Sequence, residues 1–209
     1  MLTVLLGAVL LASPNGQSPT SSPLQFDCPP RDEASRDQQL VAVRAKLRHS
    51  VAHRDIAGVL AVTSREIRAS FGPDDGLEFF KRDLANKRSA IWDELSAVLD
   101  LGGVFETPET FVAPFSYGCG EPGEEVVVVG SGVRVRSSPR PTASVVSSVS
   151  FAVLRRSDEL SPSNWQPVQL PDGRRGFIAA RFVRSPIGYR AYFTRVNGVW
   201  RLAAFIGGD

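Results

Sequence analysis

Between residues 125 and 184 the chain is divided into short apolar or alternating segments, each ended by glycine, proline, asparagine or serine. In the segment "VRVR", Val133 and Val135 alternate with Arg134 and Arg136. This two-residue period is typical of a strand that buries one face and exposes the other. Because the segments are too short for ordinary helices, they predict a small all-β barrel of closely spaced strands.

The two ends of this stretch resemble a bacterial SH3-like domain. "VRVRSSPR" matches the opening strand of that family, which has the form L-N-V-R-S-G-P-S, and "WQPV" and "DGRRGF" match its closing W-x-x-V and D-G-R-x-G segments. The resemblance implies a binding module of the cell envelope rather than an enzyme. Its groove would stack aromatic rings on a ligand and hold a carboxylate through charge-assisted hydrogen bonds. The resemblance assigns Arg136, Trp165, Arg174 and Phe177 to that groove.

Between residues 32 and 121 the apolar period is helical instead. A helix is expected over residues 32–53, where Leu40, Val43, Leu47 and Val51 form one apolar stripe. A second helix should start at Asp55, and "LEFFKRDLANK" and "SAIWDELSAVLDLGG" predict two more. The segment "EIRASFG" alternates, which predicts a strand with Ile67 and Phe71 on one face. "ETFVAPFSYG" is expected to form another strand.

The last residues predict a β-hairpin, because Asn197-Gly198 suits a type I′ turn and the flanking segments alternate. An SH3-like barrel needs no such hairpin, whereas the front region is short of strands. Both observations fit a second resemblance. "VAHRDIAGVLAVTSREIRASFGPDDGLEFF" and "NGVWRLAAFIG" are similar to the start and the end of nuclear-transport-factor-2-like cone domains. Relatives of such domains bind small molecules or use one carboxylate or histidine in an apolar pocket for proton transfer.

The two resemblances together predict an α+β protein. A cone-like domain would comprise residues 30–121 and 186–209, and the SH3-like barrel, residues 124–185, would be inserted in it. The alternative is two domains in series, with the hairpin appended to the barrel. Two functions follow. The first is a non-enzymatic protein whose barrel binds a peptidoglycan peptide or an envelope protein; the second is a small-molecule-binding or enzymatic cone that carries an accessory barrel.

The chain begins with an apolar run over residues 2–12 and a polar tract rich in serine and proline. This pattern is typical of a secretory signal peptide, and the run is too short to span a bilayer. Residues 1–20 are therefore expected to be a signal peptide and polar linker, which places the protein in the periplasm or outside the cell without a stable membrane span. In an oxidising compartment the only two cysteines, Cys28 and Cys119, are expected to bond; two unrelated thiols are the alternative.

Charge and motif content favour binding over catalysis. Residues 122–209 carry 12 arginines against 6 acidic side chains, but no basic run exceeds two residues, so nucleic acid is not expected as a partner. His49 and His53 are four residues apart, yet "HSVAH" lacks the glutamate of H-E-x-x-H and a third ligand. No nucleophile motif or phosphate loop occurs. We therefore expect no catalytic residue, no metal and no cofactor.

Overall fold

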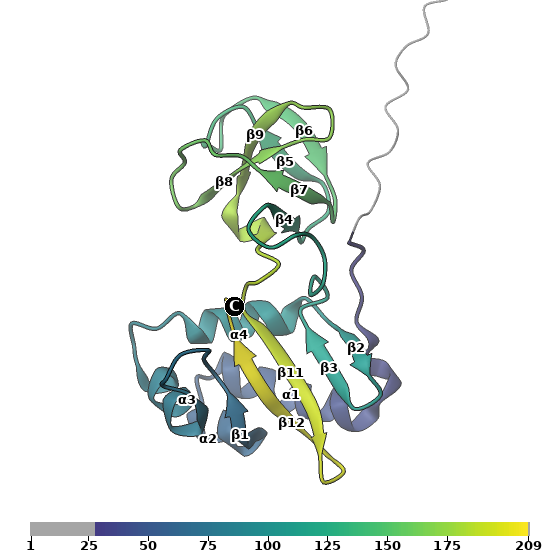
Figure 1. Ribbon diagram of the computed structural model, residues 1–209, viewed down its shortest axis with the longest axis vertical. Helices are drawn as coiled ribbons and strands as arrows, with labels where there is room; N and C mark the ends of the chain where they lie inside the picture. The colour runs from purple at the N-terminus through teal and green to yellow at the C-terminus, as the bar shows by residue number, and fades with distance from the viewer. Residues whose placement is uncertain (1–27, 209) are drawn as a thin grey trace, which may run out of the picture.

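The computed structural model describes residues 28–208, so the expected signal peptide lies outside the described residues. The chain has an α+β fold with two sheets, each built around its own core. We call the helices and the five-stranded sheet, residues 28–118 and 189–208, the α+β body. We call residues 125–184, which form the seven-stranded sheet, the β module. Figure 1 shows the β module above the α+β body.

The α+β body takes elements from both ends of the chain. Its helices are η1 (Glu33–Arg36), α1 (Gln38–Ala52), α2 (Ile56–Ala61), α3 (Gly76–Ala85) and α4 (Ile91–Asp100). Its strands are β1 (Thr63–Arg68), β2 (Val104–Thr107), β3 (Thr110–Ala113), β11 (Arg190–Val196) and β12 (Val199–Ile206). They pair in the order β1-β12-β11-β3-β2, so the last two strands of the chain occupy the middle of the sheet (Figure 1).

The C-terminal hairpin, which the alternating pattern predicted, pairs with the strands of the front region. Strand β11 is antiparallel to β3, with Phe193 opposite Phe111, and β12 is parallel to β1. Asn197 and Gly198 both have positive φ angles, 51° and 78°, which a type I′ turn requires. The two ends of the α+β body are therefore held in one hydrogen-bonded sheet.

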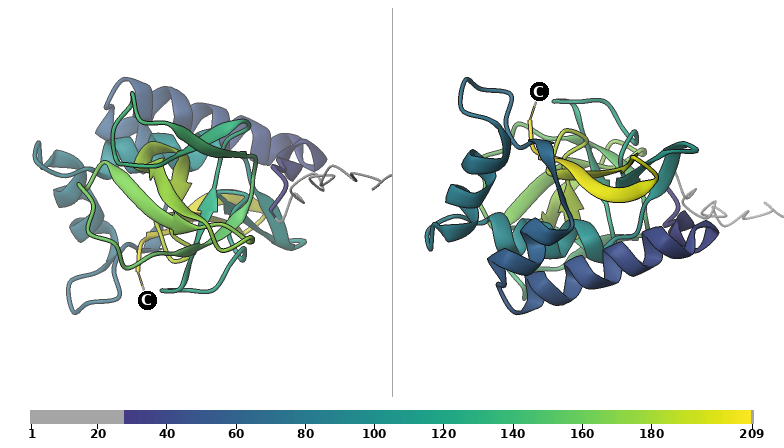
Figure 2. Two further views of the ribbon diagram at one scale, coloured as in Figure 1. Left: turned by 90° about the horizontal axis from the view of Figure 1, so that it is seen from above. Right: turned by 90° about the horizontal axis from the view of Figure 1, so that it is seen from below.

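The helices cover one face of this sheet, and apolar side chains fill the space between. Viewed from below, α1 runs along one side of the hairpin (Figure 2). Leu40 and Leu47 of α1 are completely buried, as are Phe111 and Phe193 of the sheet. One charged residue, Arg44, lies within this core; it forms an ion pair with Asp32 at 2.6 Å. Its guanidinium also lies 4.9 Å from the centre of the Phe111 ring, so the buried charge is compensated.

Two element boundaries and one helix cap differ from the sequence expectation. Helix α1 starts at Gln38 after a short 3-10 turn, because the Asp37 carboxylate caps it. Asp55 precedes α2, but its side chain makes no capping hydrogen bond. Strand β1 ends at Arg68, and Phe71 beyond it is 49% exposed instead of facing the core. The Asp75 carboxylate accepts hydrogen bonds from the backbone N–H groups of residues 69 and 70, which removes them from the sheet ladder.

The β module contains the alternating segments. Its elements are β4 (Glu125–Val128), β5 (Val133–Arg136), β6 (Val145–Val149), β7 (Val153–Arg156), β8 (Trp165–Gln169), β9 (Arg175–Ala179), η2 (Ala180–Phe182) and β10 (Val183–Arg184). The strands pair in the order β10-β4-β7-β8-β9-β5-β6. Val133 and Val135 are buried in its core and Arg134 is exposed, as the alternation predicted.

The seven strands form an open sheet instead of the closed barrel that was expected. Its edge strands, β10 and β6, are not paired with each other in the part of the chain that the structure describes. Strand β10 has only two residues, too few to continue the ladder beyond its single partner β4. In that pair Arg184 lies opposite Val127, so the first and last strands of the β module are neighbours.

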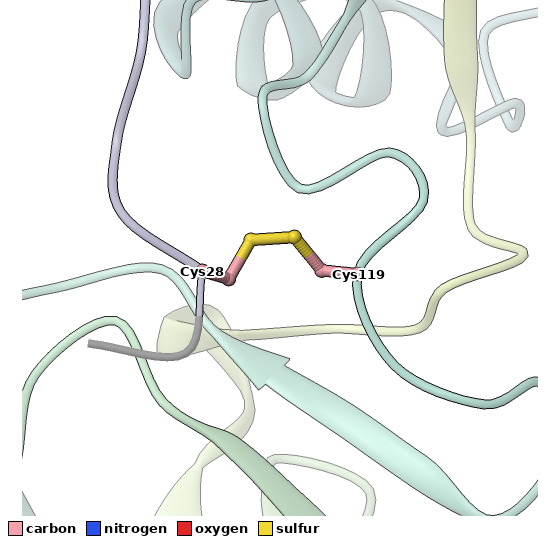
Figure 3. The surroundings of a disulfide bond; sticks show 2 residues. All are labelled: Cys28 and Cys119. Atoms are coloured by element: carbon pink, nitrogen blue, oxygen red, sulfur yellow. A yellow bond between two sulfur atoms is a disulfide. The ribbon is translucent and has the colours of Figure 1, made fainter. Parts of the chain in front are cut away.

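A disulfide stands at the junction of the α+β body and the β module. Cys28 and Cys119 are bonded, as expected, with their Cα atoms 6.0 Å apart (Figure 3). The backbone N–H of Cys28 donates to the carbonyl of Phe151, a residue of the β module, at 3.1 Å. Cys28 also packs with Phe115 and Val127 in a small buried cluster that joins the two parts. The bond therefore ties the start of the described chain to this junction.

Candidate binding groove

One face of the β module carries most of the residues that the SH3-like resemblance assigned to a groove. Opposed residues of antiparallel strands project to the same face of a sheet. Phe177 lies opposite both Arg136 of β5 and Pro167 of β8. Trp165 lies opposite Ala179, two positions further along the same strands. The register thus places Arg136, Phe177 and Trp165 on the outer face, opposite the valine core.

A groove of about 290 Å³ follows this face. Trp165 and Ala179 line it from β8 and β9, and Arg134 and Arg136 line it from β5. Arg181 and Phe182, from the short helix η2, also line it. Its remaining lining residues are Ser131, Gly132, Val133 and Pro141. The groove therefore combines half-exposed aromatic surface with three guanidinium groups.

The positive charge of the groove has no acidic counterpart among the described residues. No aspartate or glutamate lines the groove, and Arg134, Arg136 and Arg181 make no ion pair there. The acidic side chains in or next to the β module that do pair contact other arginines: Glu124 pairs with Arg155, Asp172 with Arg174 and Glu159 with Arg175. The groove is thus a local excess of positive charge.

Hydrogen bonds and ring contacts hold two of these arginines in place. Arg136 donates to the carbonyl of Ala143 at 2.7 Å, which fixes its guanidinium against the loop between β5 and β6. The guanidinium of Arg181 lies 4.7 Å from the centre of the Phe182 ring. Arg134 is exposed and has no such contact among the described residues. A ligand would meet two cations held by contacts within the protein and one exposed cation.

The structure brings together two of the four predicted groove residues. Arg136 and Trp165 line the groove, whereas Phe177 is only 7% exposed and supports the face from beneath. Arg174 does not line the groove. It forms an ion pair with Asp172 at 2.7 Å and donates to the carbonyl of Val146 on the edge strand β6. The Asp172 carboxylate holds the pKa of Arg174 above its ordinary value.

Sequence reasoning missed Arg134, Arg181 and Phe182. Arg134 shares the outward alternation of Arg136, so the two-residue period alone could have placed it on the same face. Arg181 and Phe182 follow the last long strand, and only the turn of η2 brings them back to the start of β5. No local pattern in the sequence signals that return.

The histidine pair of the sequence is not part of a metal cluster within residues 28–208. His49 of α1 and His53, which follows the helix, are exposed and lie with their ring centres 4.3 Å apart and their planes tilted by 38°, and no group of three or more potential metal ligands is present in this range. Nor does any helix within the same range have the length and hydropathy needed to cross a bilayer.

The protein therefore consists of an α+β body joined to a β module that carries a basic, aromatic groove. No family model matches the sequence, and no curated protein matches it significantly. Among solved structures, the chain is similar to a nuclear-transport-factor-2-like protein of unknown function from Pseudomonas putida KT2440. The two share 12% identity with a TM-score of 0.28, over 84% of this chain and 87% of that one.

Proposed function

We propose that this is an exported, non-enzymatic protein whose β module, an SH3-like domain, binds an acidic ligand of the cell envelope. Its ligand is a peptidoglycan peptide, and an acidic segment of an envelope protein is the alternative. The observation that carries the proposal is the groove itself, where three arginines without carboxylate partners surround Trp165.

The chemistry of the groove fits an extended peptide with free carboxylates. Guanidinium groups form short, charge-assisted hydrogen bonds to carboxylates, often two at once. Trp165 and Phe182 offer ring surface on which the apolar part of such a peptide can lie. Binding energy usually comes from a few well-packed contacts that exclude water, so most of the affinity should come from these groups.

Titration of the full chain with a soluble peptidoglycan stem peptide tests the proposal. The unmodified peptide should bind, and the same peptide with its carboxylates amidated should bind at least tenfold more weakly. Replacing one groove arginine, in Arg134→Gln or Arg181→Gln, should weaken binding by about tenfold or more, since a hydrogen bond to a charged group contributes about 1.5–3 kcal/mol. Added salt should weaken the wild type more than either variant.

Arg155→Gln and Arg174→Gln serve as matched controls. Both residues belong to the β module and carry the same charge, but each is paired with an acidic neighbour outside the groove. Both controls should bind like the wild type. Equal losses in controls and groove variants would reveal attraction by net charge alone and contradict a groove. Binding of an acidic protein segment but of no stem peptide would select the alternative ligand.

A further inference from the structure

The loop between strands β7 and β8, residues 157–164, holds a leucine in full contact with solvent. Leu160 is 99% exposed, whereas no other large apolar side chain among residues 28–208 is more than 50% exposed. Removing apolar surface from water is favourable, so this side chain gains from any surface that covers it. The fold itself provides no such surface, which leaves Leu160 available to a partner.

Hydrogen bonds fix the base of this loop and leave its tip free. The backbone N–H of Ser157 donates to the carbonyl of Pro167 at 3.1 Å. The backbone N–H of Trp165 donates to the carbonyl of Pro162 at 2.9 Å. Between these bonds lie residues 158–160, which we call the loop tip. Because its base is already ordered, binding the tip costs less conformational entropy than binding a flexible segment.

The loop tip carries two acidic side chains beside Leu160. Asp158 is exposed and makes no ion pair or hydrogen bond within residues 28–208. Glu159 forms only a long ion pair with Arg175, at 3.9 Å. The tip thus combines an unpartnered carboxylate with an apolar side chain. The groove of the β module offers the complement, since it combines arginines that lack carboxylate partners with the ring of Trp165.

The loop tip does not occupy the groove of its own chain. None of residues 157–164 lines the groove, and the exposure of Leu160 excludes contact with Trp165 of the same chain. Trp165 nevertheless follows the loop directly, so the loop and the groove adjoin. Two copies related by a twofold axis can therefore each place a tip in the other's groove, and every contact is then formed twice.

We propose that the groove binds the loop tip of a second copy of this chain and that the protein forms a weak reciprocal dimer. Asp158 pairs with the arginines of the groove, and Leu160 lies on the ring of Trp165. The inference rests on the proposed function in that it takes the groove as an acceptor of acidic ligands. It adds that a second copy fills the groove when no wall peptide is present, so a bound tip and a stem peptide exclude each other.

Sedimentation velocity of the full chain measures the dimer. Because the contact is small, we expect weak association, and protein concentrations up to about 1 mM are needed to populate it. The tip variant carries Asp158→Asn with Leu160→Ser, and the groove variant carries Arg134→Gln with Arg181→Gln. Each should weaken dimerisation at least tenfold, and added salt should dissociate the wild-type dimer. A wild type that stays monomeric up to about 1 mM overturns the proposal.

The matched control carries Glu124→Gln with Val145→Ser. It removes one exposed carboxylate and one exposed apolar side chain from outside the loop tip and the groove, since Val145 lies on the edge strand β6. All substituted residues of the tip variant and of the control are exposed, so these chains should fold normally. The control should dimerise like the wild type. A control that loses the dimer while the tip variant keeps it would place the contact at the edge of β6 and contradict the tip.

A mixture of the tip variant and the groove variant gives the sharpest test. The tip variant has an intact groove and the groove variant has an intact tip, so a mixed pair retains one of the two contacts. Each variant alone should be monomeric, whereas the mixture should form dimers that are weaker than those of the wild type. A mixture that remains monomeric while the wild type dimerises would show that tip and groove do not bind each other.

The stem peptide separates this inference from the proposed function. Added to the wild-type dimer, it should produce monomers. Peptide binding that leaves the dimer intact would overturn the occupancy of the groove by the tip. A dimer that depends on both tip and groove, in a protein that binds no stem peptide, would support the tip contact and contradict the peptide ligand. A monomeric chain that binds the stem peptide would contradict the dimer alone.

Discussion

Asp37 caps helix α1 and forms an ion pair with Arg195 of strand β11, although 158 residues separate the two. One carboxylate oxygen of Asp37 accepts the N–H groups of Gln39 and Leu40, at 2.9 and 3.1 Å, and the other contacts Arg195. The guanidinium of Arg195 also lies 5.0 Å from the centre of the Trp200 ring. A residue before the β module and a residue after it thus fix each other.

This ion pair should contribute measurably to the stability of the α+β body. Only 19% of the Asp37 side chain and 32% of the Arg195 side chain are exposed, so solvent screens the pair less than a surface pair. We expect a coupling energy of about 1–2 kcal/mol from a double-mutant cycle of Asp37→Asn and Arg195→Gln in urea unfolding. Asparagine keeps the helix cap, so the cycle measures the charge.

The exposed pair of Arg54 and Asp93 supplies the control, with 63% and 83% of the side chains accessible. Its cycle should give no more than about 0.5 kcal/mol, as for surface pairs in general. A coupling energy for Asp37 and Arg195 no larger than that of the control would contradict the assigned role.

The carboxylate of Asp75 should make the free energy of unfolding depend on pH. Its carboxylate accepts the backbone N–H of Ala69 at 2.6 Å, and this bond, with those from Ser70 and Arg68, outweighs the opposing effect of burial and lowers its pKa to about 2. Because the folded pKa lies below the unfolded value, the contribution is fully present above about pH 4 and is lost as the pH falls towards 2.

The measurement is urea unfolding of the wild type and of Asp75→Asn between pH 2 and 7. The wild type should be more stable at pH 7 by about 1–2 kcal/mol, and this advantage should shrink below pH 4. An advantage that stays constant down to pH 2 would show that the carboxylate charge has no part in it.

Patterns with a short period predicted much of the fold. The alternation at Val133 and Val135 placed one face of β5 in the core, and the Asn197-Gly198 turn predicted the last hairpin. Phe71 shows the limit of such patterns. Its alternation with Ile67 predicted burial, but the strand ends early because Asp75, which follows the segment, takes the N–H groups that a longer strand would have used.

Only those groove residues that lie on paired strands could be predicted from the sequence. Arg136 and Trp165 lie on strands β5 and β8 and project to one face of the sheet, and the family pattern assigned both. Arg174 carries the charged group expected of a groove residue, but it pairs with the neighbouring Asp172 instead. The shape of the turn decides this pairing. Arg181 reaches the groove through a three-residue helix that carries no signal of its own.

The disulfide should stabilise the whole chain. The bonded cysteines are 91 residues apart, and closing a loop of that length removes unfolded-state entropy corresponding to up to about 4–5 kcal/mol. Reduction, or the variant Cys28→Ser with Cys119→Ser, should therefore lower the free energy of unfolding by several kcal/mol. Thiol labelling of the purified native protein should find no free thiol before reduction. Two free thiols per chain would contradict the bond.

The division into an inserted and a host domain gives the last prediction. Arg184 lies opposite Val127, and neighbouring strands are about 5 Å apart, so a short linker can join the chain on either side of the β module. Replacing residues 125–185 by four glycine and serine residues should leave the α+β body folded, because its sheet and its main core contain no residue of the replaced segment. The shortened chain should keep its helical circular dichroism and unfold in one cooperative transition. It should be less stable than the full chain by about 1–3 kcal/mol, since Cys28 and Phe115 lose the apolar contact with Val127 and the pair of Arg184 and Glu94 is lost.

Residues 122–186 expressed alone are the complementary control and should fold with a spectrum of strands only. If the shortened chain has no cooperative transition, the α+β body and the β module form a single folding unit and the insertion of one domain in another is wrong.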